Sequence, residues 1–120
     1  MSELIVCLST GKGTWGHVSR LIQDGEWEKI FLITNDFGKE NFTPDKPAEF
    51  LVIDPNKEIN ELRDDIYNQL KSNVKSGEVD IGLNMVSGTG KEHMALVAAV
   101  LKLGIGIRLI ALTKNGVEEI

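Results

Sequence analysis

Two short segments of the chain combine glycine, hydroxyl and lysine side chains in a pattern that suits anion binding. One of them, residues 84–91, reads NMVSGTGK and lies between an apolar run at 79–83 and a helical pattern that continues to Leu103. Glycine lets a backbone approach a ligand closely, and the start of a helix offers unpaired N–H groups and a positive dipole end. We therefore predict a phosphodiester-binding loop made by Asn84, Ser87, Gly88, Thr89, Gly90 and Lys91.

The same segment also fits a helix cap that needs no ligand. In a capping box, Thr89 would be the N-cap and Glu92 the third helical residue, each side chain pairing with the other's backbone N–H. A cap explains these two residues, but it does not explain Ser87, both glycines and Lys91 together. The segment is not a Walker A motif, because Met85 stands at a required glycine and Glu92 at a required Ser or Thr. Both interpretations stay open.

The other segment, residues 9–16, reads STGKGTWG and follows the apolar run 4–8. Its candidate ligand-binding residues are Ser9, Thr10, Gly11 and Lys12. The stretch from Gly11 to Gly16 also matches G-x-G-x-x-G, and Asp36 lies 20 residues beyond Gly16. That layout is typical of an NAD-type dinucleotide module with the acid on the ribose. This module is the alternative function, weakened by the short helix expected at 17–23; a glycine-rich turn without a ligand is a further alternative.

Composition indicates an ordinary globular domain. The chain has 120 residues, of which 42% are hydrophobic and 26% charged, so we expect one domain over residues 1–120. The net charge is −5, from 13 basic and 18 acidic residues. Duplex nucleic acid usually needs a basic face, so we expect no such partner. A small anion held in one positive pocket remains compatible with this charge.

The sequence gives no indication of disulfides, targeting segments, membrane spans or metal sites. The single cysteine, Cys7, lies in an apolar run, which fits a reducing cytoplasm without disulfides. We expect no signal peptide and no membrane association, because residues 1–3 are acidic and no apolar stretch approaches the length of about 18 residues that a span needs. No metal or other cofactor is expected, because no cluster has zinc-ligand spacing. His17 and His93 each fall in the first turn of an expected helix; acid–base and surface or capping roles stay open.

Apolar runs and helical periodicities alternate along the chain. The runs predict strands at 4–8, 29–34, 50–53, 79–83 and 107–112, with a helical turn near 38–42. Asp54 as N-cap and Pro55 as first helical residue predict a helix that Gly77 ends. The next helix is apolar on most sides up to its stop at Gly104, so we expect it to be central or in a subunit interface. The hairpin signal at 114–116 predicts a short antiparallel strand over 117–120.

This order predicts an α/β fold, a three-layer Rossmann-like domain with a mainly parallel sheet and a C-terminal antiparallel hairpin strand. In such sheets, ligands bind beyond the carboxyl ends of the strands where strand order reverses. Both glycine-bearing segments follow strands, so we expect both to open on that edge.

The segment from Asn84 to Lys91 with its flanks, together with Ser9 and Thr10, resembles the CARF family, the Rossmann-like sensors associated with CRISPR systems. The resemblance implies binding of cyclic oligoadenylate, with cyclic tetra-adenylate favoured, across a two-fold homodimer. It carries the ligand contacts over to Ser9, Thr10, Asn84, Ser87, Thr89 and Lys91.

Some CARF proteins are also ring nucleases, which cut their ligand without metal by attack of a ribose 2′-hydroxyl on the adjacent phosphate. The resemblance then implies catalytic roles for Lys91, in stabilising phosphate charge, and for Ser9, in positioning. We see no winged-helix or HEPN module in the sequence, which favours turnover over signalling to an effector. Binding without cleavage, the ring size of the ligand and a purely structural subunit remain open.

Overall fold

The computed structural model describes residues 2–75 and 77–120. Its centre is a six-stranded sheet in the order β3-β2-β1-β4-β5-β6. The strands are β1 (Ser2–Cys7), β2 (Trp27–Thr34), β3 (Glu49–Val52), β4 (Asp80–Asn84), β5 (Gly106–Thr113) and β6 (Gly116–Glu119). The first five run parallel, and β6 pairs antiparallel with β5. The predicted α/β, mainly parallel Rossmann-like fold is confirmed.

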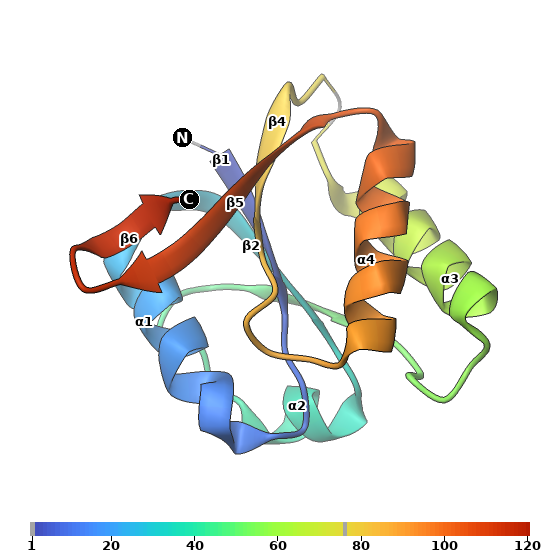
Figure 1. Ribbon diagram of the computed structural model, residues 1–120, viewed down its shortest axis with the longest axis horizontal. Helices are drawn as coiled ribbons and strands as arrows, with labels where there is room; N and C mark the ends of the chain where they lie inside the picture. Colours follow the sequence, from blue (N-terminus) through green and yellow to red (C-terminus); the bar gives the residue numbers. More distant parts are fainter. Residues whose placement is uncertain (1, 76) are drawn as a thin grey trace.

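Helices cover both faces of this sheet (Figure 1). They are α1 (Trp15–Asp24), α2 (Asp36–Asn41), α3 (Ile59–Asn73) and α4 (Gly90–Leu103), with a 3₁₀ turn η1 at Lys12–Thr14. Helices α3 and α4 lie side by side on one face, and α1 lies on the other. No helix in the described part of the chain is long and apolar enough to cross a membrane.

Strand β1 shows why the first apolar run has no polar alternation. Successive strand residues point to opposite faces, so Ile5 and Cys7 join the core under α3 and α4 while Leu4 and Val6 join the core under α1. Coverage on both faces therefore accounts for the continuous apolar run at 4–7 of this strand.

The order of the strands reverses between β1 and β4. From β1 the chain proceeds outward through β2 and β3, and then returns to place β4 and β5 on the other side of β1. The loops that follow β1 and β4 therefore flank the switch point, where open α/β sheets bind ligands.

One predicted helix start is wrong. Asp54 and Pro55 do not open α3, which begins at Ile59 with Glu58 in the N-cap position. Asp54 Oδ1 instead accepts a hydrogen bond of 3.0 Å from the N–H of Asn56, which makes a local turn of the kind that Asp favours. The helix also ends at Asn73, before Gly77, because Val74 already adopts extended dihedrals.

Candidate anion-binding site at the switch point

The two glycine-bearing loops are joined directly to each other. The backbone N–H of Ser9 donates to Ser87 Oγ at 2.8 Å, and Ser87 Oγ donates to Ser9 Oγ at 3.1 Å. Ser87 is fully buried, so its hydroxyl serves this junction in the structure. The structure thus brings together, at one edge of the sheet, two segments that lie 78 residues apart.

Gly88 is sterically required in the second loop. Its φ is +117°, a conformation that residues with a side chain rarely adopt. A Cβ at this position would lie 2.7 Å from Cys7 Sγ and 2.9 Å from His93 Nε2. Gly90 differs, because a Cβ there would meet nothing within 4 Å. Of the two glycines, only Gly88 determines the path of the loop.

The predicted capping box is present at the start of α4. Thr89 Oγ1 accepts from the N–H of Glu92 at 3.2 Å, and Glu92 Oε1 accepts from the N–H of Thr89 at 2.7 Å. The N–H groups of Gly90 and Lys91 also belong to the first turn, where no intrahelical carbonyl can pair them. The cap therefore occupies part of the helix start and leaves two donors for another acceptor.

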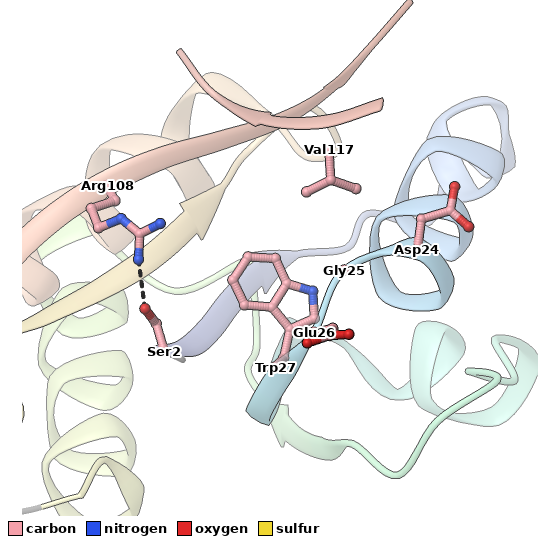
Figure 2. Close-up of a pocket in the computed structure, with 7 residues that line it drawn as sticks. All are labelled: Ser2, Asp24, Gly25, Glu26, Trp27, Arg108 and Val117. Carbon is pink, nitrogen blue, oxygen red and sulfur yellow. Dashed lines mark hydrogen bonds between the residues drawn. The ribbon is translucent and has the colours of Figure 1, made fainter. Parts of the chain in front are cut away.

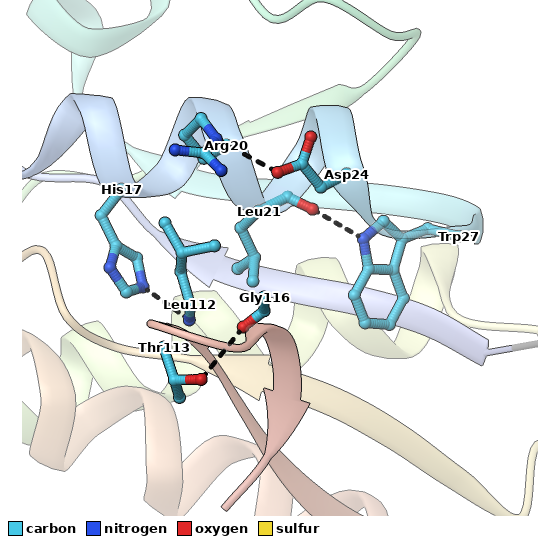
Figure 3. A network of polar contacts seen from close by, with 8 residues as sticks. All are labelled: His17, Arg20, Leu21, Asp24, Trp27, Leu112, Thr113 and Gly116. Carbon is cyan, nitrogen blue, oxygen red and sulfur yellow. Dashed lines mark hydrogen bonds and ion pairs between the residues drawn. The ribbon is translucent and has the colours of Figure 1, made fainter.

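Asn84 is held by contacts that the sequence did not reveal. It is only 2% exposed, and its Nδ2 donates to the Ile110 carbonyl at 2.8 Å. The same Nδ2 lies 3.3 Å from His17 Nε2, which also accepts from the N–H of Leu112 at 3.4 Å (Figure 3). Two N–H donors face this nitrogen, so it is the acceptor of a neutral imidazole. Burial lowers the pKa of His17 below its usual 6.5, which favours the same neutral form.

His93 and Cys7 both lie close to Gly88 in the second loop. His93 Nε2 lies 2.9 Å from the carbonyl oxygen of Ser87, and since a carbonyl only accepts, the ring nitrogen donates. Burial, and then the charge of Glu92, raise the pKa of the Cys7 thiol to about 12. Cys7 is therefore a neutral packing residue rather than a nucleophile, and His93 supports the loop backbone.

The remaining predicted residues are accessible. Thr10, Gly11, Lys12, Thr89, Gly90 and Lys91 are exposed, and Ser9 is partly exposed. Lys91 Nζ donates to the Pro55 carbonyl at 2.9 Å. Lys12 Nζ lies 5.7 Å from the centre of the Trp15 ring. Both ammonium groups are on flexible side chains that can turn toward an anion.

The first loop is held by its tryptophan and does not reproduce the geometry of a dinucleotide fingerprint. Trp15 Nε1 donates to the Ser9 carbonyl at 2.8 Å, so this ring packs the loop in place. None of Gly11, Gly13 and Gly16, all in the described part of the chain, has a positive φ. A Cβ on Gly13 or Gly16 would meet nothing within 4 Å. The fingerprint glycines are needed for a tight turn and for close helix–strand packing, and neither need exists here.

A cavity of about 390 Å³ lies elsewhere (Figure 2). It lies at the amino ends of the parallel strands and is lined by Ser2, Trp27 and Arg108 among others. Arg108 is already engaged there, since it donates to Ser2 Oγ and its Nε donates to Glu119 Oε1 at 3.0 Å. None of the predicted site residues lines this cavity.

Comparison of the chain with protein-family models gives no match, and comparison with curated proteins gives no significant match. Among the described residues, no group of three or more His, Cys, Asp or Glu side chains could hold a metal ion.

Proposed function

We propose that the protein binds a nucleotide phosphodiester at the switch point, and that the ligand is the cyclic oligoadenylate which the CARF resemblance implies. The observation that carries the proposal is the Ser9–Ser87 junction, which joins a glycine- and lysine-bearing loop after β1 to one after β4. Open α/β sheets bind ligands at this position.

The accessible residues supply the ligand contacts in this proposal. The N–H groups of Gly90 and Lys91 and the hydroxyls of Thr10 and Thr89 donate to phosphate oxygens, and the ammonium of Lys91 neutralises charge. Asn84 and Ser87 are buried, so they act by supporting the site: Ser87 joins the two loops, and Asn84 ties the second loop to β5 through the Ile110 carbonyl.

A symmetric second copy is part of the proposal. Met94 and Leu101 on α4 are 67% and 63% exposed, although both are large and apolar. The helix is therefore not central in the monomer. Exposed apolar surface of this kind marks interaction sites, and a two-fold interface uses the same patch on both subunits.

Cleavage would need only positioning of the ligand and stabilisation of charge on its phosphate. A ribose 2′-oxygen forms a bond to the adjacent phosphorus, the 5′-oxygen of the next nucleotide leaves, and the proton of the 2′-hydroxyl ends on that oxygen. The product is a linear chain with a 2′,3′-cyclic phosphate and a 5′-hydroxyl. Ser9 would orient the reacting groups and Lys91 would stabilise charge on the phosphate.

Two measurements test the function. Cyclic tri-, tetra- and hexa-adenylate are compared with NAD and NADP by thermal shift, because a ligand that binds only the folded state raises its stability. The same cyclic ligands are then incubated with excess protein in EDTA and separated by chromatography. We expect cyclic tetra-adenylate to raise the melting temperature and to be slowly linearised, and its 2′-O-methyl form to bind without being cut.

The outcomes separate the candidate functions. Binding with intact ligand after hours would leave a sensor and exclude a ring nuclease. A shift with NAD or NADP alone would favour the dinucleotide module, for which the position of Asp36, two residues beyond the end of β2, is the supporting observation. No shift with any ligand would contradict both.

A further inference from the structure

Another cavity lies beyond the carboxyl ends of the parallel strands, as the two loops do. It has a volume of about 340 Å³ and is formed by segment 35–37 after β2 and segment 53–56 after β3. The carboxyl ends of these parallel strands place it beyond the sheet on the side where α/β folds bind ligands.

Each of the two loops contacts a residue that lines this cavity. Lys12 Nζ, from the loop after β1, lies 5.6 Å from the centre of the Phe37 ring. Lys91 Nζ, from the start of α4, donates to the carbonyl oxygen of Pro55 at 2.9 Å. Phe37 and Pro55 both line the cavity, so a lysine from either phosphate-binding loop reaches its rim.

The lining side chains suit a nucleoside. Phe37 is 40% exposed, which leaves ring surface for a base to stack on. The carboxylates of Asp36 and Asp54 can accept hydrogen bonds from ribose hydroxyls, although one oxygen of Asp54 already accepts from Asn56. A carboxylate pair would repel a bare phosphate, so the cavity favours the sugar and base.

We propose that this cavity is the nucleoside subsite of the protein: a base stacks on Phe37, the ribose hydroxyls donate to Asp36, and the attached phosphate lies toward Lys12 and Lys91. The subsite rests on the proposed function, because it deepens the same binding site by placing the ribose and the base of one nucleotide.

Removal of the Asp36 charge tests the ribose contact, because the two explanations predict opposite changes in ligand affinity. Removing a negative charge beside an anionic ligand should strengthen binding if electrostatics alone acts. If Asp36 accepts from the ribose, Asp36→Asn should instead weaken binding of AMP and of cyclic tetra-adenylate by about tenfold, the size of a lost charge-assisted hydrogen bond. Inorganic pyrophosphate has no ribose, and its binding should stay unchanged or become tighter.

Calorimetric titration of the wild type, Asp36→Asn and Phe37→Ala with these three ligands measures the effects. Phe37→Ala should weaken binding of both nucleotides by about tenfold through lost stacking, and should change pyrophosphate binding much less, since only the contact of Lys12 with the ring is lost there. Asp24→Asn is the matched control, because Asp24 lines the cavity at the opposite edge. Amide resonances of residues 35–37, 53, 54 and 56 should move on AMP addition in a ¹⁵N-labelled sample, which locates the ligand without any substitution.

The subsite and the proposed function fail in different ways. Cyclic tetra-adenylate binding that Asp36→Asn and Phe37→Ala leave unchanged, with no shift in those resonances, overturns the subsite alone. AMP binding that is sensitive to both variants, without binding of any cyclic ligand, supports the subsite and contradicts cyclic oligoadenylate as ligand. No binding of AMP or cyclic ligand by the wild type overturns both.

Discussion

Individual residues of the second loop divide into those that build it and those that can meet a ligand. A side chain at Gly88 would collide with neighbouring atoms, and the side chains of Ser87 and Asn84 are buried. Substitution of these residues therefore disturbs the loop itself. Lys91 is exposed, and its Nζ donates to the Pro55 carbonyl oxygen in another loop. Substitutions of the two kinds should therefore affect stability and binding separately.

Gly88→Ala should destabilise the protein. The alanine would have to adopt a strained positive φ, and its Cβ would collide with Cys7 Sγ and His93 Nε2. The free energy of unfolding should therefore fall by at least about 2 kcal/mol. Urea denaturation measures the loss. Gly90→Ala is the control, because its Cβ meets nothing within 4 Å, and it should be neutral or slightly stabilising. Equal stability of the two variants would contradict the steric account of the loop.

Lys91→Ala should weaken binding of cyclic oligoadenylate by at least about tenfold, through loss of a charge-assisted contact worth roughly 1.5–3 kcal/mol. The melting temperature without ligand should hardly change, because Lys91 is exposed. Fluorescence or calorimetric titration gives the affinity. Lys102→Ala, an exposed lysine in the last turn of the same helix, is the control and should bind as the wild type does.

His17 should make stability depend on pH. Its pKa is lowered in the fold, so the unfolded chain binds more protons once the pH falls below the usual value of 6.5. The free energy of unfolding should consequently fall as the pH is lowered from 6.5 through the folded pKa. Urea titrations at several pH values should show that His17→Gln removes part of this slope. A slope that is identical in the variant would assign the pH dependence to other groups.

At the scale of elements, α4 connects the cap, the candidate ligand loop and the exposed apolar side chains. Its first turn holds the capping box, and its C-cap Gly104 adopts the left-handed conformation that ends the helix. Its buried side contributes Leu96 and Val100 to the core that α3 and the sheet share. The helix is therefore anchored at both ends and along one face, which gives the loop before it a rigid support.

Thr89→Ala should remove the cap and lower the free energy of unfolding by about 1 kcal/mol. Thermal and urea denaturation measure the change, with Thr10→Ala, an exposed threonine of the first loop, as a control that should be neutral. The combination with Lys91→Ala is decisive. A destabilised Thr89→Ala protein, together with undiminished ligand binding in Lys91→Ala, would mean that the segment is a cap and no ligand loop.

At the scale of the whole molecule, we predict a two-fold homodimer that uses the exposed side of α4. Met94→Glu combined with Leu101→Glu places charges on both large apolar side chains, so it should convert the dimer to a monomer. Light scattering coupled to size exclusion at micromolar concentration measures the mass. Val79→Glu is the control, because Val79 is 82% exposed but lies before β4. A monomeric wild type would contradict the prediction.

Features that depend on local spacing could be predicted from the sequence alone. Core strands are continuous apolar runs because they are buried on both faces. The capping box depends on residues three positions apart, and the turn at Lys114 and Asn115 with Gly116 at φ +109° connects adjacent strands. Strand–helix alternation then implied a parallel sheet, and the carboxyl edge as the place where both loops open. The start of α3 was mispredicted because Asp54 can serve a turn as well as a helix cap.

The contacts that shape the candidate site were decided by tertiary structure. Ser9 meets Ser87, and His17 reaches Leu112, across 78 and 95 residues of sequence. No local period or spacing specifies such pairs, because they exist only once β1 lies between β2 and β4. The same holds for the cavity beyond β2 and β3, whose two walls come from separate connections. Sequence determined which residue types could bind an anion; the strand order determined which of them meet.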